Sequence, residues 1–190
     1  GRGARYVTLD DVPFPMLFDP AIRGQVEKQG KDPERLLDQY IDLTNASFSS
    51  APSDMTVGLH MCRGNLKGTW LSEGSYQAIS EKLFNKLNVD VFFLEYDTER
   101  AGGFEPLAAM PDDKMVVLGL VSSKVPDMES KDSLKARIEE AAKYVDLERL
   151  AISPQCGFSS AVIGNPVTVH DQIAKLKLTV DVAQEVWCSA

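Results

Sequence analysis

The sequence has little basic charge and no long apolar run. Its 190 residues include 20 lysines and arginines against 28 aspartates and glutamates, which gives a net charge of −8. Nucleic acids and anionic membranes bind basic surfaces, so this balance argues against both as partners. No stretch reaches the roughly 18 apolar residues of a membrane-spanning helix. The first residues, GRGARYVTLDD, also lack the layout of a signal peptide. We therefore expect a soluble, cytoplasmic protein.

Cysteine is also scarce. Cys62, Cys156 and Cys188 are too few and too scattered for a disulfide framework in a chain of this size, which leaves metal binding or a reactive thiol. The composition, 44% apolar and 25% charged, is average for globular proteins and argues against a disordered or fibrous chain. Because no linker or break in composition divides the sequence, we expect a single domain over residues 1–190.

Short apolar runs alternate with longer stretches that have a helical pattern. The runs start at residues 6, 56, 89, 115 and 150, so the spacings are 50, 33, 26 and 35 residues. That spacing fits a strand, a crossover helix and two loops, which is the repeating unit of a parallel sheet. The predicted strands are Tyr6–Leu9, Thr56–Leu59, Val89–Leu94, Met115–Val121 and Leu150–Ser153.

Start signals support the predicted helices. Asp32 before Pro33 resembles an N-cap followed by proline at the first helical position. Ser75 is expected to open a second helix, and a third is expected over Ser133–Tyr144. Thr168 with Asp171 three residues later resembles a capping box. In the helix that follows, one face carries Ile173, Leu176, Val180, Ala183 and Trp187.

Two architectures fit about five strand–helix units. One is an open doubly wound sheet, and the other is the C-terminal part of a (β/α)₈ barrel, which needs about 250 residues when complete. The chain begins without a methionine, directly ahead of a predicted strand. This favours the barrel, as a catalytic fragment whose first strands lie upstream. In that case an upstream barrel half is the expected partner of its exposed strand edges.

Residues able to do chemistry cluster where the predicted strands end. Because the carboxyl ends of parallel strands form one rim, they should meet there. His60 and Cys62 are two residues apart, so both side chains point to the same side of an extended backbone. One imidazole, two thiolates and a carboxylate are ligands that zinc accepts. The residues that follow the strands are Asp10, Asp11, His60, Cys62, Glu95, Ser122, Ser123 and Cys156.

Each of these residues also has an ordinary structural interpretation. A single cysteine is more often a buried inert thiol than a ligand, and a histidine at a strand end is more often a hydrogen-bonded structural residue. Asp10 and Asp11 could simply cap or solvate a loop. We expect Cys188 to lie outside any site and His170 to be solvated in the first turn of its helix. The joint placement of His60, Cys62, Glu95 and Cys156 favours the metal site.

Five motifs together resemble a known family. LDDVPF, LHMCRGN, FFLEYD, SSKVP and SPQCGF, in this order, resemble the C-terminal catalytic barrel of cobalamin-independent methionine synthase, and most of all its short single-barrel relatives. The resemblance implies a zinc ion at the barrel mouth and methyl transfer to the sulfur of homocysteine. It implies that His60, Cys62, Glu95 and Cys156 ligate the zinc and that Asp10 contacts the substrate amino group. Asp10 and Glu95 are then the predicted catalytic residues, and Asp10 and Asp11 the predicted substrate-binding residues.

The sequence differs from the larger synthases at one position that bears on the methyl donor. In the larger synthases a histidine, thought to protonate the leaving folate nitrogen, stands where this sequence has Val121. Another residue must supply the acid, or the donor is not methyl-folate; the candidates are Ser122, Ser123 and Asp97.

The sequence also leaves alternatives to methionine synthesis. One is the addition of another thiol, such as coenzyme M, to an epoxide. The other is a non-catalytic module that zinc only stabilises. Glu95 is the predicted ligand that moves when a thiol binds, since an oxygen donor is the hardest of the four. Three cationic side chains near these motifs are expected to be solvated surface charges: Arg63, Arg100 and Lys124.

Overall fold

The computed structural model describes residues 3–188, which form one five-stranded parallel sheet. The strand order β1-β2-β3-β4-β5 follows the chain, so every crossover joins neighbouring strands. A doubly wound sheet would reverse direction partway, and this one does not. The fold is therefore half of a (β/α)₈ barrel, as predicted. The strands are β1 (Tyr6–Asp11), β2 (Thr56–Met61), β3 (Val91–Glu95), β4 (Met115–Val121) and β5 (Leu150–Pro154).

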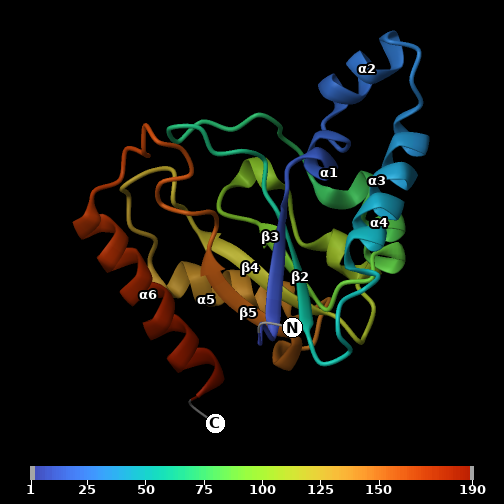
Figure 1. Cartoon of the computed structure of the whole chain (residues 1–190). Helices are drawn as coiled ribbons and strands as arrows, with labels where there is room; N and C mark the ends of the chain where they lie inside the picture. Colours follow the sequence, from blue (N-terminus) through green and yellow to red (C-terminus); the bar gives the residue numbers. More distant parts are fainter. Residues whose placement is uncertain (1–2, 189–190) are drawn as a thin grey trace.

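The helices lie around the outside of the curved sheet (Figure 1). Right-handed crossovers between neighbouring parallel strands place all connecting helices on one face, which leaves the other face for the barrel interior. The α-helices are α1 (Pro13–Met16), α2 (Pro20–Lys28), α3 (Pro33–Phe48), α4 (Ser80–Lys86), α5 (Lys131–Ala141) and α6 (Val169–Trp187). Short 3₁₀ helices are η1 (Tyr76–Ala78), η2 (Glu99–Ala101), η3 (Glu105–Ala109) and η4 (Leu147–Arg149).

Two helix starts follow the sequence signals. The Asp32 carboxylate accepts a hydrogen bond from the Glu34 backbone N–H at 2.9 Å, ahead of Pro33 in the first turn of α3. Thr168 and Asp171 form the predicted capping box of α6. Each of these caps satisfies amide groups that a helix start leaves without a partner.

Two other starts differ from the prediction. Ser75 caps the 3₁₀ helix η1, and α4 begins later, at Ser80. Helix α5 begins at Lys131 rather than Ser133, because the Ser130 hydroxyl accepts the Ser133 N–H at 3.1 Å and forms the cap. Both differences are shifts in where a helix starts, and both helices cross over between the strands as expected.

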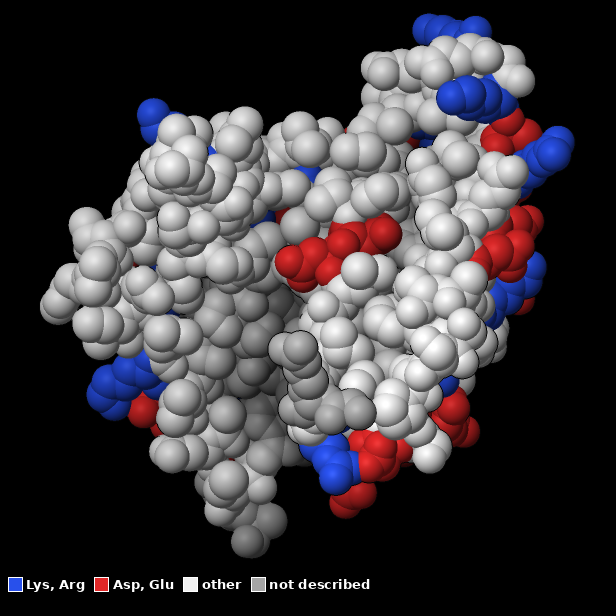
Figure 2. Space-filling model, viewed as in Figure 1, with Lys and Arg blue, Asp and Glu red and all other residues white. Residues whose placement is uncertain are grey.

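Three residues of the apolar stripe along α6 are exposed. Ile173, Leu176 and Val180 are 61%, 42% and 54% exposed, whereas Leu178 and Val182 are buried. The helix packs on β5 and α5 through the buried side. Figure 2 shows few charged side chains over α6. An exposed apolar stripe is consistent with a partial barrel, since such stripes mark surfaces that another element covers.

The sheet has two free edges in residues 3–188, because nothing pairs with the outer sides of β1 and β5. Figure 2 shows a hollow between the side that carries α6 and the side that carries β1. A closed barrel has no such edges. No helix in the described part of the chain is long and apolar enough to cross a membrane.

The hydrophobic core lies between the sheet and its outer helices. On β3, Phe92 and Leu94 are buried in this layer, and the Phe92 ring packs edge-on against Phe84 of α4 with centroids 5.1 Å apart. Burial of each such side chain stabilises the fold by about 2 kcal/mol. Phe93, between them, faces the opposite side and lines the cavity described next. This alternation places the polar strand ends inside the barrel mouth.

Candidate metal centre

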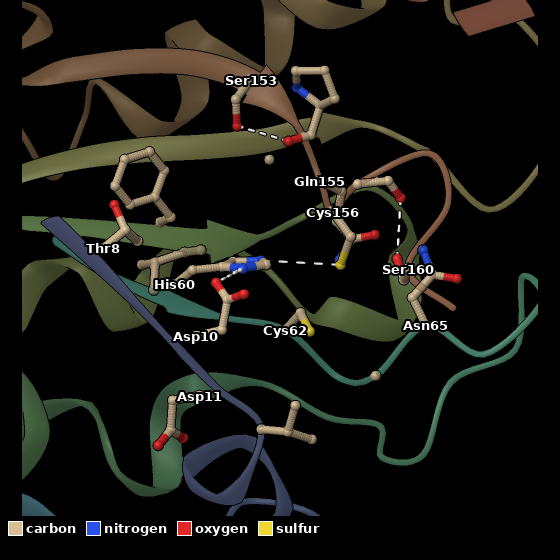
Figure 3. A pocket seen from close by; sticks show the side chains of 17 residues that line it. Thr8, Asp10, Asp11, His60, Cys62, Asn65, Ser153, Gln155, Cys156 and Ser160 are labelled. Carbon is tan, nitrogen blue, oxygen red and sulfur yellow. Dashed lines mark hydrogen bonds and ion pairs between the residues drawn. The ribbon is translucent and has the colours of Figure 1, made fainter. Parts of the chain in front are cut away.

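A cavity of about 660 Å³ lies where the strands end, and every strand contributes to its wall (Figure 3). The strand residues that line it are Thr8, Asp10, Asp11, His60, Phe93, Leu94, Gly119, Ser153 and Pro154. The loops that follow β2 and β5 add Cys62, Asn65, Gln155, Cys156 and Ser160. The carboxyl rim is where a parallel barrel carries its active site.

Three potential metal ligands converge in this cavity. The ligand atoms of His60, Cys62 and Cys156 all lie within 4.8 Å of one another, and His60 Nε2 is 4.0 Å from Cys156 Sγ. His60 is the penultimate residue of β2 and Cys62 follows the strand, while Cys156 comes from the loop after β5, 96 residues from His60. One nitrogen and two sulfur donors suit zinc. The three residues can therefore hold a metal ion, and their chemistry fits the predicted zinc.

The two thiols are linked by a hydrogen bond. Donation from the Cys156 thiol lowers the pKa of Cys62 to about 6. The same bond, together with burial, raises the pKa of Cys156. The lowered pKa favours the thiolate form of Cys62. A thiolate is the form of cysteine that binds metal.

Asp10 contacts the ligand histidine. Its Oδ1 lies 3.0 Å from His60 Nδ1. A carboxylate only accepts hydrogen bonds, so Nδ1 carries the proton and Nε2 is free to face the metal. Figure 3 shows the Asp10 side chain pointing toward the His60 ring. This orienting contact was not foreseen from the sequence. The predicted contact of Asp10 with a substrate amino group stays a prediction, and its 86% exposed side chain is accessible for it.

Asp11 points away from that ring (Figure 3), as neighbours on a strand do. Its Oδ1 accepts a hydrogen bond from the Phe14 backbone N–H at 2.8 Å. Burial raises the pKa of its carboxyl, although this hydrogen bond acts in the opposite direction. Asp11 lines the cavity and also fixes the turn into α1. Its predicted role in substrate binding stays a prediction.

Glu95, the fourth predicted ligand, lies apart from the group formed by His60, Cys62 and Cys156. Its Oε2 accepts hydrogen bonds from the Arg63 backbone N–H and from Gln155 Nε2, both at 2.8 Å. Its Oε1 faces the Lys124 ammonium at 3.4 Å and is ion-paired with Arg100. Ligation of a metal by Glu95 stays a prediction, since it would have to exchange some of these partners.

The three expected surface cations are buried, so that prediction was wrong. Arg63 is fully buried, Lys124 is 3% exposed, and the Arg100 side chain is 9% exposed. The Arg63 guanidinium donates to the carbonyl oxygens of Glu95, Gly74 and Ala101. It also stacks on the rings of Phe18 and Tyr76 at 4.8 and 4.6 Å. A buried charge needs such partners, and they hold the loop that carries Cys62.

Gln155 is a site residue that sequence reasoning missed. Its amide N–H group donates to Glu95 and to the Cys156 sulfur, and its carbonyl oxygen accepts from the Lys124 ammonium. Because an ammonium only donates, the carbonyl side of the amide must face Lys124. Both residues lie in motifs recognised in the sequence: Gln155 precedes Cys156 in SPQCGF, and Lys124 lies in SSKVP.

The residues considered as proton donors do not line the cavity. Val121 is fully buried, and Ser122 Oγ donates to Asp97 Oδ2 at 2.9 Å, away from the cavity wall. Ser123 is buried and also absent from that wall. His170 and Cys188 are exposed on α6 and at its end, outside the site, as expected.

Comparisons with known proteins bear on the family and the fold of this chain. Residues 16–185 match the sequence profile of the family described as "Cobalamin-independent synthase, Catalytic domain". The "Uncharacterized protein YxjG" of Bacillus subtilis is 44% identical over 98% of this chain and 50% of its own length. The "5-methyltetrahydropteroyltriglutamate--homocysteine methyltransferase" of Bacillus licheniformis is 25% identical over 88% of this chain and 20% of its own length.

A solved structure shows the same fold. The crystal structure of a vitamin-B12-independent methionine synthase-like protein from Listeria monocytogenes superposes with a TM-score of 0.74 and 36% identity, over 97% of this chain and 49% of that chain. The present chain therefore spans about half the length of YxjG and of the Listeria protein. The profile match begins after Asp10 and Asp11, so it does not cover these two residues.

Proposed function

The chain belongs to the cobalamin-independent synthase catalytic-domain family, and on that premise we propose that it is the thiol-activating part of a zinc-dependent S-methyltransferase that methylates homocysteine. The observation that carries the proposal is the convergence of His60, Cys62 and Cys156 within 4.8 Å in a cavity at the strand ends. A free thiol has a pKa near 8.5 and is mostly protonated at neutral pH. Zinc, when bound by these residues, supplies a positive charge that favours the thiolate form of a thiol substrate.

The chain's own residues have separate tasks in this proposal. His60, Cys62 and Cys156 hold the metal, and Asp10 fixes the imidazole of His60 so that Nε2 faces it. The exposed remainder of the Asp10 carboxylate receives the ammonium group of homocysteine. Phe93, Gly119 and Ser153 form the wall of the cavity against which the substrate chain lies. Glu95, at the edge of the site, is a fourth ligand that gives way when the substrate sulfur binds.

The rest of the barrel is part of the proposal. The free edges of β1 and β5 and the exposed stripe of α6 are surfaces for upstream strands and helices. That half supplies the remaining substrate contacts, and the present chain is one catalytic domain with it. Thiols that must stay reduced to bind a metal support a cytoplasmic location as part of this proposal.

The methyl donor decides between two reactions. Val121 offers no proton, and Ser122, Ser123 and Asp97 do not line the cavity in which a folate nitrogen would have to be protonated. Addition of coenzyme M to an epoxide uses the same thiol activation and is the competing function. Zinc-loaded protein should therefore be assayed with homocysteine and either methyl-folate or a non-folate methyl donor, and in parallel with coenzyme M and an epoxide. Methionine formation that Cys62→Ala abolishes supports the proposal, whereas epoxide consumption without methionine formation contradicts it.

A further inference from the structure

Four buried charged side chains, one of them Glu95, lie together beside the metal cavity. The Arg100 guanidinium pairs with Asp97 Oδ1 at 2.8 Å and with Glu95. The Lys124 ammonium lies 3.4 Å from Glu95 Oε1 and 3.7 Å from Asp97 Oδ2. The two acids and two bases balance, as buried charges must. We call Glu95, Asp97, Arg100 and Lys124 the buried charge cluster.

Lys124 is the member that connects this cluster with the metal ligands. Among the described residues, only its ammonium contacts both the Glu95 carboxylate and the Gln155 amide. Gln155 in turn donates to the Cys156 sulfur and to Glu95 Oε2. Arg100 shares both carboxylate partners with Lys124, but it stacks on Trp70 at 4.6 Å and makes no contact with Gln155 among the described residues. Removal of the Lys124 charge would therefore take one of two cations from Glu95 Oε1, with Arg100 left in place, and would also leave the Gln155 carbonyl oxygen without its ammonium partner.

The backbone that carries Lys124 is fixed in place. The Ser122 N–H donates to Glu129 Oε1 at 2.8 Å, and Glu129 Oε2 is paired with the buried Lys175 of α6 at 3.0 Å. Ser122 Oγ accepts the Lys124 N–H at 3.3 Å. These bonds anchor the loop after β4 to α6, so Lys124 presents its ammonium from a defined position. A rigid support of this kind is what a residue needs to orient a neighbouring group.

We propose that Lys124 is a positioning residue whose ammonium draws the Glu95 carboxylate away from the metal and so sets how strongly Glu95 competes with a thiol substrate. The inference rests on the metal centre of the proposed function. A carboxylate divides its interaction among the positive charges around it, so loss of Lys124, even with Arg100 in place, strengthens the interaction of Glu95 with a bound metal. Without Lys124, Glu95 should therefore bind the metal more tightly and be harder for a thiol to displace.

The test compares Lys124→Met with the charge-preserving Lys124→Arg and with Lys131→Met, which removes a half-buried lysine of α5 outside the site. Zinc affinity is measured by competition with a chromophoric chelator. The visible absorption of the cobalt-loaded chain is then followed as homocysteine is added. We expect Lys124→Met to bind zinc about tenfold tighter and to need about tenfold more homocysteine for the same spectral change. Lys124→Arg and Lys131→Met should stay near the wild type.

A double substitution separates positioning from simple loss of charge. Removal of any nearby positive charge favours a bound cation through space, and that effect persists in Glu95→Gln. If Lys124 acts through the Glu95 carboxylate, its substitution should no longer change zinc affinity in a chain that already carries Glu95→Gln. Lys124→Gln, which keeps N–H donors, is studied in parallel and must shift in the same direction if Lys124→Met does not fold. Unchanged affinity in the neutral variants, or an equal gain in the Glu95→Gln background, would overturn the inference. A wild-type chain that binds no zinc would instead refute the metal centre itself.

Discussion

Asp10 Oδ1 lies 3.0 Å from His60 Nδ1, and the two residues are direct partners in the register that joins β1 to β2. The pairing of two parallel strands thus places a carboxylate behind a predicted metal ligand. Carboxylates in this position fix the tautomer and the orientation of a ligating imidazole. The contact links the sheet register, which the apolar pattern of β1 and β2 determines, to the chemistry of the site.

This relationship predicts the effect of removing the carboxylate. In Asp10→Ala the His60 ring loses its orienting partner, so zinc affinity should fall by about tenfold or more. The neighbouring Asp11→Asn is the control, because its amide oxygen can still accept the Phe14 N–H and it does not contact His60. That variant should stay within about twofold of the wild type. Equal zinc affinity in Asp10→Ala and wild type, by chelator competition, would show that Asp10 does not orient the ligand.

Burial of Arg63 predicts a loss of stability on a conservative change. Arg63→Lys keeps the charge, but one ammonium cannot replace the fork of donors that binds Gly74, Glu95 and Ala101. We expect the free energy of unfolding of the metal-free chain, from urea titration, to fall by about 3 kcal/mol. Arg35→Lys, at an exposed position of α3, should change it by less than about 0.5 kcal/mol. Similar values for the two variants would mean that the Arg63 bonds contribute little.

The interface of α5 and α6 gives a pH dependence. Hydrogen bonds from Lys131 and then Lys135 lower the pKa of Glu185 to about 2, from an ordinary value of 4.5. A carboxyl whose pKa is lower in the folded state stabilises the fold above its unfolded pKa, and this contribution is lost as the pH falls through the folded pKa. The stability difference between wild type and Glu185→Gln should therefore be constant above pH 4.5 and disappear towards pH 2. Solvent screening keeps it small.

The control for this pH series is Glu139→Gln, which removes an exposed carboxylate of α5 that has no ion pair in the described part of the chain. Its stability difference from wild type should not follow the same curve. A Glu185→Gln difference that grows as the pH falls would contradict the assigned sign.

The sequence predicted the fold because its signals are local. The spacing of the apolar runs and the caps at Asp32 and Thr168 depend on neighbouring residues, and each was found as expected. The placement of His60 and Cys62 on the same side of an extended backbone also depends only on neighbouring residues. Nothing in the sequence indicated which face of α6 is buried, because Ile173, Leu176 and Val180 form an apolar stripe whether or not a neighbour covers it. Only the tertiary contacts decide which face is buried.

The cations near the site could not be placed for the same reason. Lysine and arginine are solvated in most proteins, and nothing adjacent to Lys124 in the chain indicates Glu95 and Gln155 as its partners. Those partners lie 29 and 31 residues away and meet it only when β3, β4 and β5 align. The rim was predictable from strand ends, whereas the hydrogen-bond network behind it required the structure.

The account depends on one claim, that Cys62 and Cys156 share a metal ion with His60, and the zinc content of the purified chain tests it most directly. Wild type should be compared with Cys156→Ala and with Cys188→Ala, which removes an exposed thiol outside the site. We expect about one zinc per chain in wild type and Cys188→Ala, and its loss in Cys156→Ala. Equal zinc in all three proteins, or none in the wild type, would contradict the metal centre.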